Sequence, residues 1–171
     1  MPCSLTVSEV EPFEGRRPLR RSPPCKTSCV PGGPADPFAL LSSEFRKLQL
    51  QLRPLCQGIE AGLTSLRSRL DRLAVAALVA DDQGGYLAVN RAASALTGYR
   101  RDELERMCVW DLTPVPDLHT GERLWAAFIE MREQRGTYSL QGKHGTIHHV
   151  HYLARAHVLP GMHLSLLCCA D

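Results

Sequence analysis

One stretch, residues 76–99, constrains the fold of this chain more than any other. It reads AALVADDQGGYLAVNRAASALTGY. Two short apolar runs, 76–79 and 86–89, flank a polar turn with two aspartates and two glycines, which is the pattern of a β-hairpin. After Asn90, the alanine-rich segment 91–96 with a glycine behind it predicts a short helix that ends at that glycine. The stretch therefore predicts a strand, a turn, a second strand and a helix of about two turns.

The first 37 residues differ in composition from the rest of the chain. They are rich in proline and show little apolar periodicity. Such a segment buries too little apolar surface to offset the entropy lost on ordering, so residues 1–37 are predicted to be disordered. They contain no apolar run behind a basic start, as a secretory signal would, and the chain has no run of about 18 apolar residues. A cytoplasmic protein without a membrane span is expected.

Residues 38–73 are predicted to form an amphipathic helical segment. Apolar residues recur at steps of three and four from Phe38 to Leu52, and Pro54 then kinks the helix or starts a new one. A seam of nearly three heptads follows, formed by Cys56, Ile59, Leu63, Leu66, Leu70 and Leu73. This seam can pack on the domain that follows it, or against its copy in a second chain as a short coiled coil. Both alternatives stay open, and a homodimer is the expected partnership.

The pattern changes from helical to extended along the second half of the chain. A helical turn is predicted at 102–106, followed by a longer helix that ends at Gly136 and buries Leu124, Trp125, Phe128 and Met131. After it the hydrophobic period becomes two, which predicts three strands, at 137–140, 146–159 and 162–169.

This order of elements, together with particular residues, resembles the PAS family over about residues 73–171. The stretch 76–99 is similar to the family's first hairpin and alanine-rich helix, RRDEL and VWDLTP to its next segments, and KHGTIHHVHYLARAHV to its late hairpin. Arg106 stands where the family often has glycine, and His144 where it often has aspartate. The resemblance implies an α+β fold, with a five-stranded antiparallel sheet of order 2-1-5-4-3 and helices packed on one face. The PAS domain is then expected at 74–171.

A PAS pocket is expected to hold haem, flavin, a metabolite or nothing. The Asn-Cys-Arg-Phe run of the blue-light subfamily does not occur in the sequence, which disfavours a thiol-flavin adduct. A haem needs an axial ligand such as a histidine on the long helix, and His119 stands only at its start. The cofactor is therefore left unknown. The candidate pocket residues are Trp110, Leu124, Trp125, Phe128, Tyr138 and His148.

Four histidines lie in the segment 148–157. Alternation along a strand places His149, His151 and His157 on the outer face of the sheet and His148 on the inner face. Imidazoles on one face could share a zinc or copper ion, or could charge together near neutral pH. The favoured interpretation is that they are half-exposed strand residues covered by the preceding amphipathic helix. No metal site is assigned.

No enzyme is expected, and no catalytic residue is assigned. The chain has no nucleophile elbow, phosphate loop, zinc-protease helix or paired catalytic carboxylates. A formal net charge of +2 is too small to imply binding to nucleic acid. The expected function is a signal-sensing or protein-interaction module, without an output domain of its own. It would act through a homodimer or a signalling partner, with a small molecule as candidate ligand. The alternative is a ligand-free structural adaptor that regulates a kinase or a transcription factor.

Overall fold

The computed structural model describes residues 36–52, 59–113 and 118–170, and only the backbone of 59–63 and 118. Most of the segment expected to be disordered, together with Pro54 and Cys56, lies outside the described residues.

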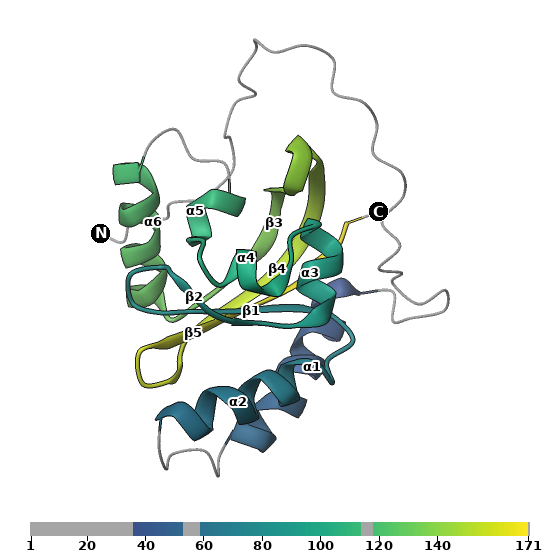
Figure 1. The fold of residues 1–171 in the computed structure, drawn as a ribbon, viewed down its shortest axis with the longest axis vertical. Coiled ribbons are helices and arrows are strands. Elements are labelled where there is room, and N and C mark those ends of the chain that lie inside the picture. The colour runs from purple at the N-terminus through teal and green to yellow at the C-terminus, as the bar shows by residue number, and fades with distance from the viewer. Residues whose placement is uncertain (1–35, 53–58, 114–117, 171) are drawn as a thin grey trace, which may run out of the picture.

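A five-stranded antiparallel sheet forms the middle of the protein (Figure 1). Its strand order is β2-β1-β5-β4-β3, which confirms the order that the family resemblance implied. The strands are β1 (Ala76–Ala80), β2 (Tyr86–Val89), β3 (Glu133–Gln141), β4 (Ile147–Leu159) and β5 (Met162–Cys169). All five residues of β1 are buried, because this strand has neighbours on both sides and is covered on both faces.

Helices cover both faces of the sheet (Figure 1). One face carries α3 (Arg91–Thr97), α4 (Arg101–Leu104), α5 (Val109–Leu112) and α6 (Leu118–Met131), as the fold prediction required. The opposite face, called the outer face below, carries α1 (Pro37–Leu52) and α2 (Ile59–Leu70), which are the predicted amphipathic segment. Within the described part of the chain, no helix combines the length and apolar character needed to cross a membrane.

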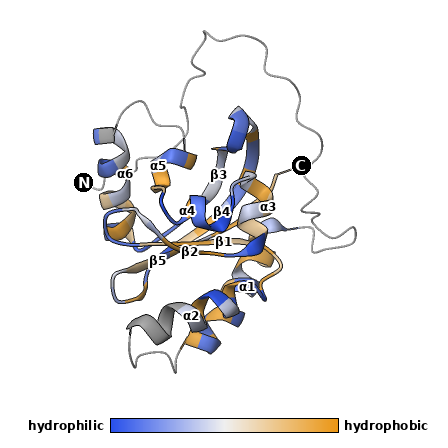
Figure 2. Cartoon of the chain, in the orientation of Figure 1, coloured by the Kyte–Doolittle hydropathy of each residue, from blue (hydrophilic) through white to orange (hydrophobic). Residues whose placement is uncertain are grey.

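The alternation of side chains along the strands divides the interior into two apolar layers. On β5, Leu164 and Leu166 point to the outer layer beneath α1 and α2, whereas Leu167 points to the layer beneath α3 to α6. Figure 2 shows the central strands as largely hydrophobic. The outer layer is completed by α1 residues Leu41, Phe45, Leu48 and Leu52. The amphipathic pattern of residues 38–52 is therefore explained by packing within the chain.

The predicted hairpin and short helix at 76–99 are confirmed. Asn90 lies at the N-cap of α3, where its side-chain oxygen accepts a hydrogen bond from the Ala93 N–H at 2.9 Å. Gly98 ends the helix at φ 76°, a left-handed conformation that glycine adopts without strain.

The predicted end of the long helix at Gly136 is wrong. Helix α6 ends at Met131, Arg132 turns the chain at φ 66°, and β3 begins at Glu133. Glu133, Gln134 and Arg135 favour a helix by intrinsic propensity, but they pair with Arg155, Ala154 and Leu153 of β4. Here pairing in the sheet outweighs the helix propensity of these residues, which is worth only about 0.5 kcal/mol per residue.

Candidate functional site

Three tyrosines of the strands, Tyr86, Tyr138 and Tyr152, lie in the layer between the sheet and α3 to α6. Tyr86 is buried, and the rings of Tyr138 and Tyr152 meet edge to face with centroids 5.3 Å apart. Burial raises the pKa of each of the three phenols; for Tyr138 a hydrogen bond with Thr113 opposes this in part. These side chains therefore present neutral hydroxyl groups in an apolar layer, and such groups can orient a small ligand.

Two tryptophans approach the turn between β1 and β2. A Cβ atom on Gly84 would lie 2.8 Å from the ring of Trp110, and one on Gly121 would lie 3.2 Å from the Trp110 Cβ. Larger residues at these two positions would push Trp110 away, so α5 lies close to the turn on one side and to α6 on the other. Trp125 of α6 donates a hydrogen bond from its indole nitrogen to the Asp82 carbonyl oxygen at 3.1 Å.

The six predicted pocket residues do not form one group. Trp125 and Phe128 are in contact, with ring centroids 5.0 Å apart, whereas Leu124 is 53% exposed and does not join the interior. His148 lies near the start of β4, where burial lowers the pKa of its imidazole. Phe128 instead packs against His163, whose ring also meets that of His157 near the other end of β4. The nine residues from His148 to His157, at about 3.3 Å each, span roughly 30 Å of extended strand. His148 and Phe128 therefore lie near opposite ends of β4.

Sequence reasoning missed a buried histidine on β5. His163 is 1% exposed, and its ring centroid lies 5.4 Å from that of Trp125 and 6.1 Å from that of Phe128. Its Nε2 atom is 2.9 Å from a carboxylate oxygen of Asp82, which had been interpreted only as a turn residue. The available signal was alternation, because His163 shares its face of β5 with Leu167.

The outer face covers one of the β4 histidines, as the favoured interpretation expected. The ring of Phe38 on α1 meets His151 edge to face at 5.4 Å, and the His151 Nδ1 atom is buried without a hydrogen-bond partner among the described residues. His149 is exposed, with its Nδ1 atom 3.2 Å from the Ser139 hydroxyl. The expectation for His157 is wrong, because a register shift between Arg155 and Leu159 turns its ring toward His163.

The described end of the heptad seam packs within the chain. Leu66, Leu70 and Leu73 are at most 9% exposed and belong to the outer layer. The side chains of Ile59 and Leu63 lie outside the described residues, as does Cys56. Of the two alternatives for the seam, packing on the following domain is the one seen in the single chain.

Asn90 joins α2, the sheet and α3. Its side-chain nitrogen donates to the carbonyl oxygens of Leu70 at 3.0 Å and Val75 at 2.8 Å. Its side-chain oxygen accepts from the N–H groups of Ala77 at 3.0 Å and Ala93 at 2.9 Å. All four hydrogen-bonding positions of a 1% exposed amide are satisfied, so the end of α2 is fixed relative to β1 and α3.

Two ion pairs also tie α2 and its C-terminal end to the helices on the other side of β2. Arg67 of α2 bonds both carboxylate oxygens of Glu105, at 3.1 and 2.9 Å. Asp71 accepts two hydrogen bonds from Arg101, at 2.8 and 2.9 Å, and one from the Arg91 N–H at 2.8 Å. Although partial burial tends to raise the pKa of Asp71, the bonds from Arg101 and Arg91 lower it overall.

Comparisons with known proteins agree with this architecture. The family model described as "PAS fold" matches residues 64–170, which is more than half of the chain, and the chain therefore belongs to the PAS family. PAS domains are generally sensory modules rather than enzymes. No curated protein sequence matches the chain.

Three solved structures similar to this chain are PAS domains or a domain of a sensor protein. A domain of a sensory box sensor histidine kinase/response regulator from Geobacter sulfurreducens is 21% identical, with 65% of this chain and 96% of that chain covered and a TM-score of 0.54. A PAS domain from Desulfitobacterium hafniense is 21% identical, with coverages of 61% and 100% and a TM-score of 0.52. A PAS domain of an HTR-like protein from Haloarcula marismortui is 16% identical, with coverages of 74% and 99% and a TM-score of 0.55. At these identities the likeness shows the fold alone.

Proposed function

We propose that the chain is a signal-sensing or protein-interaction module whose output passes through α2 to a second copy of the chain. The observation that carries the proposal is the Asn90 junction. One buried amide bonds the last turn of α2, the first residues of β1 and the start of α3. A change in the packing of β1 or α3 would therefore reach α2 directly.

The second copy is proposed because α2 carries an apolar seam that can serve either of two partners. In the single chain Leu66 and Leu70 pack on the sheet and α1. On leaving the sheet they would expose two large apolar side chains, and the same seam in another chain offers matching leucines. The signal would act by shifting the balance between these two arrangements, which requires that it stabilise one over the other.

The experiment weakens one tether of α2 without touching its seam. Arg67→Gln removes the ion pair with Glu105 and the contact with the Leu87 carbonyl oxygen. Arg72→Gln is the matched control. Arg72 lies five residues after Arg67 and its side chain is exposed, so the substitution removes the same charge. Light scattering on the full chain over a range of concentrations should show Arg67→Gln with the larger mean mass. Equal masses for the two variants at every concentration would overturn the proposal.

The ligand-free adaptor is the second candidate function, and the packing of Trp110 favours it. Its ring lies against Gly84 and Gly121 closely enough that a Cβ atom at Gly84 would overlap it. Side chains would then fill the interior that a ligand would otherwise occupy. Native mass spectrometry of the purified chain separates the two candidates. An added mass that is lost on unfolding supports a sensor with a ligand, whereas the mass of the polypeptide alone supports the adaptor.

A further inference from the structure

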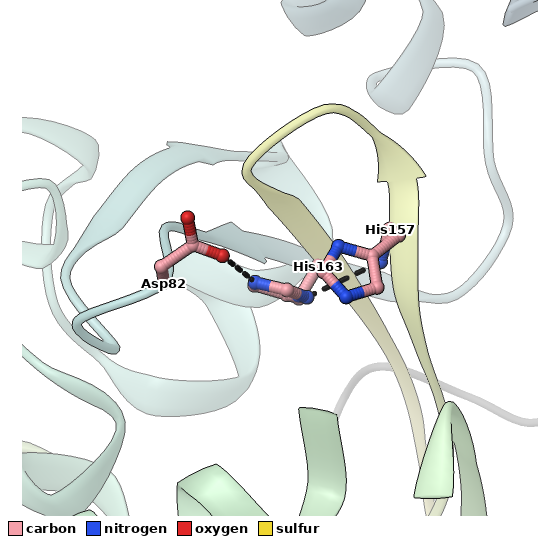
Figure 3. A group of neighbouring side chains, drawn as sticks. All are labelled: Asp82, His157 and His163. Atoms are coloured by element: carbon pink, nitrogen blue, oxygen red, sulfur yellow. Dashed lines mark hydrogen bonds and ion pairs between the residues drawn. The ribbon is translucent and has the colours of Figure 1, made fainter. Parts of the chain in front are cut away.

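Asp82, His157 and His163 come together from three parts of the chain, as Figure 3 shows. Asp82 belongs to the β1–β2 turn, His157 to the irregular part of β4, and His163 to β5. One ligand atom from each residue lies within 4.8 Å of the other two. His163 is buried, whereas Asp82 and His157 are exposed, so the group has a fixed base and two ligands open to solvent.

The backbone at His157 is a second, independent observation. His157 has φ 54°, in the left-handed region that few residues other than glycine adopt, and it lies where the register of β4 shifts. A bulge of this kind redirects a side chain, and here it brings the His157 ring to 5.0 Å from the His163 ring. Strained backbone of this sort concentrates at functional sites. Regular alternation would have left the two imidazoles on opposite faces of the sheet.

We propose that these three residues bind a divalent first-row transition-metal ion such as Zn²⁺. Two imidazoles and one carboxylate are donors that zinc commonly uses, and a water molecule completes a four-coordinate site. Ligand atoms about 2.0 to 2.1 Å from a tetrahedral ion lie roughly 3.3 Å from one another. The Nε2 atom of His163 and the Asp82 carboxylate oxygen are 2.9 Å apart, so this pair needs only a small movement of the exposed Asp82 side chain. The exposed His157, whose ligand atom lies within 4.8 Å of the other two, has to turn its ring toward the ion.

The hydrogen bonds of His163 define what happens to its proton. The Nδ1 atom accepts a hydrogen bond from the His157 N–H at 3.2 Å, which places the proton of the neutral ring on Nε2, facing Asp82. A metal ion bound by Nε2 and Asp82 takes the position of that proton. The proton then moves to Nδ1, where it meets the His157 N–H, and two donors repel. Metal binding therefore opens this hydrogen bond and changes the turn between β4 and β5.

The test compares two histidines with the same backbone conformation. His157→Asn removes a ligand but keeps a residue that tolerates positive φ. His144→Asn is the matched control, because His144 is exposed, has φ 64° and lies in the turn before β4. Asp82→Asn, also at an exposed position, removes the second ligand while preserving side-chain size. Calorimetric titration of each full-length protein with Zn²⁺ measures its affinity for zinc. All four proteins contain the same seven cysteines, so any zinc binding by thiols is the same in every sample.

The wild type and His144→Asn should each bind one zinc ion with the same affinity. His157→Asn and Asp82→Asn should bind it at least tenfold more weakly. The same affinity in all four proteins would place the zinc elsewhere and overturn the proposal, as would the absence of zinc binding in the wild type. A second measurement needs no variant: Ni²⁺ bound here should quench Trp125, whose ring is 5.4 Å from His163. Unchanged tryptophan emission at saturating Ni²⁺ would contradict the site. The inference does not depend on the proposed signalling role.

Discussion

The side-chain nitrogen of Asn90 donates a hydrogen bond to the carbonyl oxygen of Leu70 at 3.0 Å. This bond connects the residue that caps α3 to the last residue of α2, across 20 positions of sequence. The same side chain bonds Val75 and Ala77 at the start of β1. One side chain therefore bonds the end of α2 to the sheet and to α3.

Asn90→Ala should lower the free energy of unfolding by about 3 to 5 kcal/mol. Four backbone groups lose a hydrogen bond, although the Leu70 carbonyl keeps the one from the Leu73 N–H. Buried groups left unsatisfied cost about 1 to 3 kcal/mol each, with some recovery by relaxation. Urea denaturation followed by circular dichroism measures the change. Ser139→Ala, at a half-buried position of β3 whose hydroxyl meets only the exposed His149 ring, is the control and should change stability by less than about 0.5 kcal/mol. A loss below about 1 kcal/mol for Asn90→Ala would contradict the junction.

The ion pair of Asp71 with Arg101 predicts a specific loss of stability in acid. The folded-state pKa of Asp71 lies below its ordinary value of 3.8, so the unfolded chain takes up the proton first. The stabilisation is complete above that ordinary value and disappears as the pH falls through the lower, folded-state pKa. Asp71→Asn should therefore be less stable than the wild type at neutral pH, and the difference should shrink below about pH 4. A difference that stays constant between pH 7 and pH 2 would be inconsistent with this assignment.

The buried tyrosines predict the opposite behaviour in alkali. Burial raises the pKa of Tyr138 in the folded protein above its ordinary value of 10.0. The stabilisation is present below that value and is lost as the pH rises further, because only the unfolded chain releases the proton easily. Tyr138→Phe should reduce the loss of stability above about pH 10, measured by urea denaturation at each pH. Equal losses for both proteins would show that Tyr138 does not contribute.

His151→Leu should stabilise the protein by about 1 to 2 kcal/mol. The Nδ1 atom of His151 is buried beneath Phe38 without a hydrogen-bond partner among the described residues, and an apolar side chain of similar size removes that unfavourable burial. Thermal and urea denaturation both measure the change. His149 on the same strand is exposed, and His149→Leu therefore serves as the control. Destabilisation by His151→Leu would mean that the imidazole has a favourable role under α1.

Local signals were sufficient to predict much of the fold. The segment 76–99 specifies its own hairpin and helix, because the turn residues, Asn90 and Gly98 each satisfy a local geometric requirement. Residues 162–169, bounded by the turn at Pro160 and Gly161, form β5 at the predicted positions. The start of β3 was missed because its polar residues become a strand only through pairing with β4.

The candidate sites depended on relationships that periodicity does not contain. Alternation along β4 is interrupted by the register shift near His157, and no local signal announces that shift. His163 and Asp82 are 81 residues apart, so their contact follows from the order of the strands alone. The heptad seam suits packing on the sheet and packing on a second chain equally well, and the sequence left that choice open.

The central proposal is that α2 is a movable output element. Hydrogen exchange of the backbone amides in the full chain tests it most directly. If α2 is such an element, its amides should exchange through a local opening, and the free energy of that opening should be lower than the free energy of opening β1 and β5. Arg67→Gln should lower the opening free energy of α2 and leave that of the two strands unchanged. If the amides of α2 instead exchange only with global unfolding, and Arg67→Gln shifts α2 and the sheet by equal amounts, the proposed output through α2 is contradicted.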